Sequence, residues 1–125
     1  MLLNFCTAKP PTKSILVIDD DLPTLDMLKS SLTRNGYTVD TAQSGEEALK
    51  KNKSNGYNII LTDIQMPGIS GIQILKHLKN DEDPTRVIGM SGTPWLLDQK
   101  NFDAVLSKPC TLNELKDTIA RVITN

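Results

Sequence analysis

The sequence lacks any apolar run long enough to cross a membrane, which requires about 18 or more consecutive apolar residues. The amino-terminal stretch MLLNFCTAKPPTK has no basic segment before its short apolar patch, so it does not match the pattern of a secretion signal peptide. Cysteine is also scarce, because Cys6 and Cys110 are the only 2, and two such distant cysteines do not make a disulfide framework. We therefore expect a protein of the reducing cytoplasm that does not bind membranes.

The sequence has no excess of charge of either sign. Its 125 residues include 14 Lys+Arg and 15 Asp+Glu, a formal net charge of −1. Proteins that bind nucleic acid directly usually carry a clear basic excess, so the balance argues against that class. The length and the 38% share of hydrophobic residues are typical of one soluble domain with a single core. Pro10 and Pro11 mark a lead-in, which we place at residues 1–12, with the domain at residues 13–125.

Short apolar runs alternate with helical patterns along this domain. The strands are predicted at residues 14–18, 37–42, 57–63, 86–90 and 103–107. Leucine spacing after residue 22, the pattern of residues 70–79 and capping signals at Ser44 and Thr111 place helices between and after the strands. This repeated strand–helix alternation predicts an α/β fold, a doubly wound parallel sheet with helices on both faces.

Polar residues stand where the predicted strands end. They are Asp19, Asp20 and Asp21 after the first strand, Asp63 after the third, Ser91 after the fourth and Lys108 after the fifth. In open parallel sheets, ligands bind at the carboxyl ends of the strands, so we expect these side chains to converge. Clustered carboxylates repel one another unless a divalent cation such as Mg²⁺ lies among them. A carboxylate beside such an ion can accept a phosphoryl group, whose oxygens a lysine helps to neutralise.

The motifs ILVIDDD, ILTDIQMPGISG, VIGMSG and LSKP follow one another in this order at the ends of these strands. With them the chain resembles, over about residues 13–124, the receiver domain of bacterial two-component response regulators. The resemblance implies the flavodoxin-like (CheY-like) αβα fold with strand order 2-1-3-4-5. It also implies a phosphoacceptor signalling domain rather than an enzyme. A histidine kinase or phosphotransfer protein would donate the phosphoryl group, and the product would change its interaction with a downstream partner or output domain, or dimerise.

The resemblance further implies a role for each residue at the strand ends. Asp63 would be the phosphoacceptor and, with Asp20 and the backbone carbonyl of Gln65, would bind Mg²⁺ or Mn²⁺ directly, while Asp19 would act through a water molecule. Ser91 would be the switch hydroxyl and Lys108 would pair with the phosphate, with a cis bond to Pro109. Asp21 matches none of these roles, and we expect it to cap the first helix.

Two departures from the receiver pattern affect the later part of the chain. Val105 stands where receivers commonly carry a tyrosine or phenylalanine that moves with the switch hydroxyl. Residues 92–102 leave room for fewer than two helical turns, so we predict a short or irregular fourth crossover helix there. A lone tryptophan usually buries most of its ring, so we expect Trp95 to be at least partly covered.

Two alternative functions compete with the hypothesis of a phosphoacceptor domain. A pseudo-receiver would keep the fold as a protein-interaction module without phosphorylation, but the chain retains every residue of the implied pocket. An aspartyl-phosphate phosphatase or phosphotransferase of the haloacid-dehalogenase type requires a threonine or valine where this chain has Pro23. His77 has Lys76 and Lys79 as neighbours, which favours a solvated helix face over a phosphohistidine or a metal ligand.

Overall fold

The central strands are apolar on both faces, and a parallel sheet of this kind needs helices above and below it. The computed structural model describes residues 13–96 and 101–124. β1 (Ser14–Ile18) and β3 (Ile59–Asp63) lie at the centre of the sheet and are almost entirely buried. β2 (Thr38–Ala42) pairs with β1, while β4 (Arg86–Ser91) and β5 (Ala104–Ser107) extend the sheet beyond β3. All pairs are parallel in the order β2-β1-β3-β4-β5, which confirms the predicted sheet.

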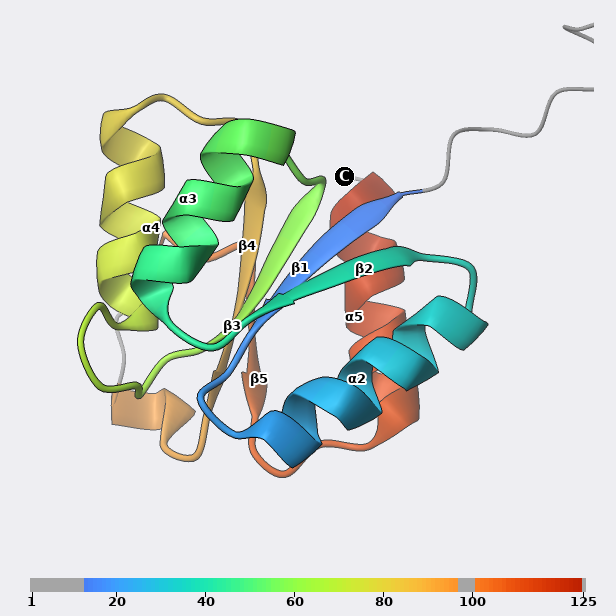
Figure 1. Cartoon of the computed structure of the whole chain (residues 1–125). Coiled ribbons are helices and arrows are strands. Elements are labelled where there is room, and N and C mark those ends of the chain that lie inside the picture. The colour runs from blue at the N-terminus through green and yellow to red at the C-terminus, as the bar shows by residue number, and fades with distance from the viewer. Residues whose placement is uncertain (1–12, 97–100, 125) are drawn as a thin grey trace, which may run out of the picture.

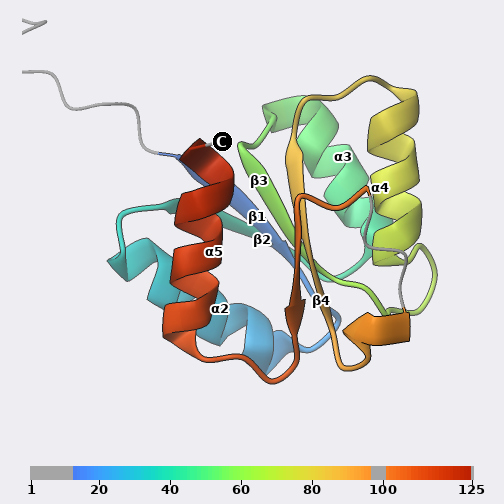
Figure 2. The same cartoon turned by 180° about the vertical axis from the view of Figure 1, so that it is seen from behind.

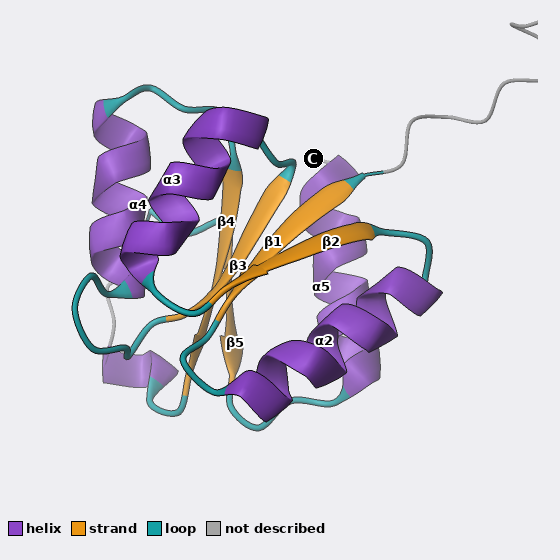
Figure 3. Cartoon of the chain, viewed as in Figure 1, coloured by secondary structure: helices purple, strands orange, loops and turns teal. Residues whose placement is uncertain are grey.

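Helices cover both faces of this sheet (Figures 1 and 2). α2 (Leu22–Arg34) and α5 (Leu112–Thr124) pack on one face, and α3 (Gly45–Asn55) and α4 (Gly71–Asn80) pack on the other. Figure 3 shows the resulting three layers, with the strands between the helices, as the αβα prediction requires. Within the described ranges no helix is both long and apolar enough to span a membrane.

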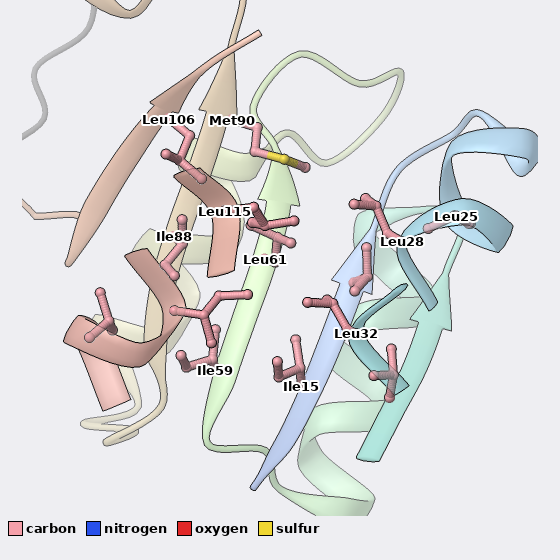
Figure 4. Packing of buried hydrophobic residues seen from close by; sticks show 14 residues of the cluster. Ile15, Leu25, Leu28, Leu32, Ile59, Leu61, Ile88, Met90, Leu106 and Leu115 are labelled. Carbon is pink, nitrogen blue, oxygen red and sulfur yellow. The ribbon is translucent and has the colours of Figure 1, made fainter. Parts of the chain in front are cut away.

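Alternate residues of each strand point into one of two apolar cores. The core under α2 and α5 is shown in Figure 4, where Leu25, Leu28 and Leu32 of α2 face the sheet. The other core lies under α3 and α4 and contains Ile74 and Leu78. Burying a side chain of this size contributes about 1.5–3 kcal/mol, so the two cores together provide the main driving force for folding.

The helices begin at capping residues. Asp21 caps α2 by accepting a hydrogen bond from the Thr24 amide at 3.1 Å, which confirms the role expected of it. At the start of α5, Thr111 Oγ1 accepts from the Glu114 amide and Glu114 Oε1 accepts from the Thr111 amide, a complete capping box. A further box, formed by Ser70 with Gln73, starts α4 and escaped the sequence analysis.

The segment between β4 and β5 begins with η1 (Pro94–Leu96), a single 3₁₀ turn, in agreement with the short or irregular helix predicted there. The prediction also covers residues 97–100, which lie outside the described residues. Trp95 is 73% exposed, so the expectation of a covered ring is wrong. The reason is the place of η1, which lies beyond the carboxyl end of β4 and outside both helical layers (Figure 1).

Gly89 provides a test of the packing beneath α4. A Cβ atom at Gly89 would lie 2.7 Å from Ile64 Cδ1 and 3.1 Å from Phe102 Cε1, closer than packed side chains allow. We predict that Gly89→Ala lowers the free energy of unfolding in urea by about 1–3 kcal/mol, the usual cost of overpacking a core. Gly92→Ala is the matched control, because a Cβ at Gly92 meets nothing within 4 Å. Equal stability of the two variants would contradict this packing.

Candidate functional site

The carboxyl ends of the strands bring the expected polar residues to one edge of the sheet. Asp19 directly follows β1, Asp63 ends β3, Ser91 ends β4 and Lys108 follows β5. These ends lie together at the lower edge of the sheet in Figures 1 and 3, where the loops lead into α2, α4 and α5. The residues are far apart in the sequence, and parallel register alone makes them neighbours.

Three carboxylates form a cluster at this edge. One oxygen from each of Asp19, Asp20 and Asp63 lies within 4.8 Å of the others. Asp19 is 2% exposed and Asp63 is 9% exposed, whereas Asp20 faces solvent. Mg²⁺ binds oxygens at about 2.0–2.1 Å, so the ligand oxygens around it lie roughly 3–4 Å apart. The cluster therefore fits a hard divalent cation after only small side-chain movements.

The ammonium group of Lys108 bridges two of these carboxylates. Its Nζ lies 3.2 Å from Asp63 Oδ2 and 3.4 Å from Asp19 Oδ2. Burial by itself would lower the pKa of Lys108, but the negative charges of Asp19 and Asp63 outweigh it and raise the pKa. Lys108 therefore remains a cation at the point where a phosphoryl group on Asp63 would carry its negative charge.

Within the cluster, burial disfavours the ionised form of Asp19. Burial raises the pKa of its carboxyl group, and the charge of Asp63 adds to this effect. A hydrogen bond from the Asp21 amide to Asp19 Oδ1 at 3.0 Å and the charge of Lys108 act in the opposite direction without cancelling it. The ionised form of Asp19 therefore destabilises the metal-free fold, and a cation bound here would relieve that cost.

Backbone contacts hold Asp63 in place. The Gln65 amide donates to Asp63 Oδ1 at 3.2 Å, so the structure sets Gln65 next to the cluster, with its side chain exposed. Ile64, which directly follows Asp63, donates its amide hydrogen to the Met90 carbonyl, and its own carbonyl accepts a hydrogen bond from the Gly71 amide. A Cβ at Gly71 would lie 2.9 Å from Ile64 Cα, so only glycine allows α4 to start this close to β3.

Ser91 connects β4 to the turn that follows it. Its side chain is 2% exposed, and its Oγ accepts a hydrogen bond from the Thr93 amide at 3.0 Å. Its carbonyl accepts from the Lys108 amide at 2.8 Å, so the backbones that carry the hydroxyl and the ammonium are joined directly. The Lys108-Pro109 peptide bond that follows is cis, which confirms the prediction.

Other residues singled out in the sequence lie outside the cluster. Asp21 caps α2, and its hydrogen bonds with the Thr24 side chain and amide lower the pKa of its carboxyl group. His77 is exposed on α4, as expected. Cys110 is half-buried against the core beneath α5, and this burial raises the pKa of its thiol.

Two buried residues were missed by the sequence analysis. Asn52 of α3 donates to Asp83 Oδ2 at 2.9 Å, and no described residue donates a hydrogen bond to its buried Oδ1. Phe102 is 8% exposed and packs beneath α4. The available signal was weak in both cases, since Asn52 lies at a core-facing spacing after Gly45 and Ala48, and Phe102 is an isolated aromatic before β5.

The fold and the carboxyl edge together define the class of receiver domains, in which acidic residues and a lysine meet at the ends of parallel strands. The chain belongs to the family of the response regulator receiver domain, whose sequence profile matches residues 15–120.

The chain is similar in sequence to known regulatory proteins. The polar-differentiation response regulator DivK of Brucella ovis is 29% identical over 115 residues, covering 86% of this chain and 94% of DivK. The alkaline phosphatase synthesis transcriptional regulatory protein PhoP of Bacillus subtilis is 29% identical over 124 residues, covering 89% of this chain but only 48% of PhoP. The chain thus matches DivK over nearly its whole length and PhoP over about half of it.

Solved structures agree on the same fold. The chemotaxis response regulator CheY4 of Vibrio cholerae superposes with a TM-score of 0.83 at 25% identity, over 90% of this chain and 99% of that chain. The response regulator TrrA of Thermotoga maritima, solved in complex with Mg²⁺ and BeF, has a TM-score of 0.81 at 33% identity, over 89% of this chain and 99% of that chain. The predicted CheY-like fold is therefore confirmed.

The cost of burying the ionised Asp19 carboxylate can be tested through protein stability. We predict that Asp19→Asn raises the melting temperature in EDTA by about 3–5 °C, or roughly 1 kcal/mol for a chain of this size. The pKa of Asp19 in the folded state lies above its unfolded value of 3.8. The ionised carboxylate therefore lowers the free energy of unfolding at pH values above the folded-state pKa. The advantage of the variant should therefore fade as the pH falls towards 3.8.

Calorimetry with and without Mg²⁺ measures this effect. Asp26→Asn makes the same charge change on the exposed face of α2 and should leave the melting temperature unchanged. Added Mg²⁺ should stabilise the wild type more than Asp19→Asn. A lower melting temperature for Asp19→Asn in EDTA would mean that the bridge to Lys108 outweighs the burial of the charge.

Proposed function

We propose that this receiver domain, comprising residues 13–125 after a lead-in of residues 1–12, accepts a phosphoryl group on Asp63 from a phosphohistidine. The donor is a histidine kinase or phosphotransfer protein of the cytoplasm. The observation that carries the proposal is the convergence of three carboxylates and one lysine at the carboxyl edge of the sheet. The TrrA structure with Mg²⁺ and BeF supports it, since TrrA shares 33% identity with this chain.

The protein contributes position and charge to the transfer. A carboxylate oxygen of Asp63 forms the new bond to phosphorus as the bond from phosphorus to the imidazole nitrogen of the donor breaks, and the imidazole keeps the electron pair. The Gln65 amide orients the Asp63 carboxylate, and Lys108 is already 3.2 Å from it. After transfer, Lys108 pairs with the phosphoryl oxygens and the Ser91 hydroxyl donates to one of them.

The carboxylates of the cluster would hold the cation. Asp20, Asp63 and the Gln65 carbonyl would bind Mg²⁺ or Mn²⁺ directly, and Asp19 would act through a water molecule, which suits its deeper burial. The bound ion would neutralise the phosphoryl oxygens as charge builds up on them. The domain thereby assists its own phosphorylation, and it acts as a signalling domain rather than as an enzyme on a separate substrate.

A groove beside the site suits the donor protein. It has a volume of about 570 Å³ and runs between α2 and the start of α5, with Lys108 at one end. Met27 and Leu112 line it and are 59% and 45% exposed, unusually high for large apolar side chains. An apolar groove of this kind accepts an amphipathic helix, so a helix that carries the phosphohistidine could dock here next to Asp63.

Phosphorylation by a small donor tests the proposal directly. We predict that acetyl phosphate with Mg²⁺ adds one phosphoryl group to the wild type, and that Asp63→Asn and EDTA each abolish this addition. Asp21→Asn is the matched control, because Asp21 is adjacent in sequence to the cluster but only caps α2. Intact-mass spectrometry measures the addition. A wild type that neither gains a phosphoryl group nor binds beryllofluoride would favour the pseudo-receiver function.

The groove predicts a difference between protein and small-molecule donors. Met27→Gln combined with Leu112→Gln should slow transfer from a phosphorylated histidine kinase at least about tenfold, equivalent to roughly 1.4 kcal/mol of lost docking energy. The rate with acetyl phosphate should stay the same, because neither side chain belongs to the carboxylate cluster. Rapid-quench assays with both donors compare the rates. Equal slowing with both donors would place the defect in the site rather than in docking.

A further inference from the structure

A second groove lies on the other side of the sheet, away from the carboxylate cluster. It has a volume of about 320 Å³ and is lined by residues of α4 and of the chain that enters β5. Ile72 of α4 and Phe102 before β5 supply apolar lining, and Lys76 and Lys79 supply charge. None of these residues has a part in the phosphoacceptor site.

The outer face of α4 presents a stripe of one apolar and two basic side chains. Ile72, Lys76 and Lys79 are spaced four and three residues apart, so they lie on the same face of the helix, and all three are exposed. The described lining includes no carboxylate, and Asp81 at the helix C-cap lines the hollow on the α3 side instead.

Within residues 13–96 and 101–124, neither lysine forms an ion pair. Among the described residues, ion pairs join Lys51 to Glu47 and Lys108 to two aspartates, and Lys76 and Lys79 take part in none of them. The chain as a whole has a net charge of −1, so this basic patch is a local feature. Two exposed ammonium groups beside an apolar floor complement a ligand that has carboxylates and an apolar side chain.

The floor of this groove reaches the strands that carry the phosphoacceptor and the switch hydroxyl. The ring of Phe102 and the side chain of Ile64 fill the space above Gly89, where a Cβ would lie 3.1 Å from Phe102 Cε1 and 2.7 Å from Ile64 Cδ1. Ile64 directly follows Asp63, and Gly89 precedes Ser91 by two residues in β4. Ile64 and Phe102 therefore connect the lining of this groove to the strand ends that carry Asp63 and Ser91.

We propose that this groove binds an acidic peptide segment of the downstream partner, and that Phe102 couples its affinity to the state of Asp63. The carboxylates of the segment pair with Lys76 and Lys79, and an apolar side chain contacts Ile72 and Phe102. The binding surface stands by itself, whereas its coupling to phosphorylation rests on the proposed function. A nucleic acid also carries negative charge, but two lysines beside an apolar floor in a chain without basic excess suit a peptide better.

Fluorescence anisotropy with a defined probe tests the surface. The probe is a short fluorescein-labelled peptide of alternating glutamate and leucine, compared with a peptide that has lysine in place of glutamate and with an oligothymidylate. We expect only the acidic peptide to bind, with an affinity that falls as the salt concentration rises. Preferential binding of the basic peptide or the oligothymidylate, or no binding of the acidic peptide, would overturn the proposal.

Charge reversal locates the binding surface. Lys76→Glu combined with Lys79→Glu should weaken binding of the acidic peptide about tenfold or more. The matched control is Lys29→Glu combined with Lys50→Glu, which reverses two exposed lysines on α2 and α3 and should change the affinity less than about twofold. Both variants should accept a phosphoryl group from acetyl phosphate as the wild type does. Equal weakening in the two variants would overturn the assignment to α4.

Beryllofluoride with Mg²⁺ tests the coupling separately. In the wild type it should change the affinity for the acidic peptide at least about threefold, and Phe102→Leu should reduce this change while leaving beryllofluoride binding intact. A wild-type affinity that does not respond to bound beryllofluoride would overturn the coupling alone. A failure of beryllofluoride to bind, followed through the amide resonances around Asp63, would count against the proposed function and leave peptide binding as the test of the groove.

Discussion

The ammonium group of Lys108 between the carboxylates of Asp19 and Asp63 is the interaction on which the carboxyl edge of this protein depends. It joins the ends of β1, β3 and β5 in one place, at 3.2 and 3.4 Å. Among the residues that the structure describes, no other cation forms an ion pair with either carboxylate, so without Lys108 two buried negative charges would face each other uncompensated. The contact only partly compensates for burial, because the pKa of Asp19 stays raised. A further positive charge at this edge would relieve the remaining cost, and a divalent cation bound by the carboxylates would supply it.

The two faces of the sheet carry different grooves. The face under α2 and α5 ends in an apolar groove that includes Lys108, where we propose that a donor helix docks. The face under α4 holds Ile64 and Phe102 above Gly89, next to a groove with two exposed lysines. Input and output would then lie on opposite faces, so a donor and a downstream partner would not compete for one surface. The sheet between them is the rigid element through which the state of Asp63 would reach the second groove.

The aromatic side chain that packs beside β4 is Phe102, which precedes β5, whereas the position within β5 is occupied by Val105. Val105 lies opposite Gly89 in the sheet and is half-buried, so it has neither the ring nor the exposure to relay a rotation to the surface. Phe102, three residues earlier, packs in the same apolar core as Val105, and its ring lies directly above Gly89. The large side chain that neighbours β4 is thus supplied from the chain before β5 rather than from β5 itself. Trp95, on the exposed η1 turn after Ser91, adds a second aromatic on the outer surface of the same region.

The sequence by itself determined the strands, the caps at Asp21 and Thr111 and the identity of the residues at the strand ends. These follow from local rules, since apolar runs need burial on both faces and Asp21 or Thr111 caps the helix that begins beside it. Only the tertiary structure decided that Asp19 is buried while Asp20 is exposed, that Trp95 projects into solvent and that Phe102 packs on Gly89 beside Ile64. Each of these depends on which distant segment lies against the residue. Burial and contact across a sheet are properties of the assembled layers, and local spacing in the chain does not encode them.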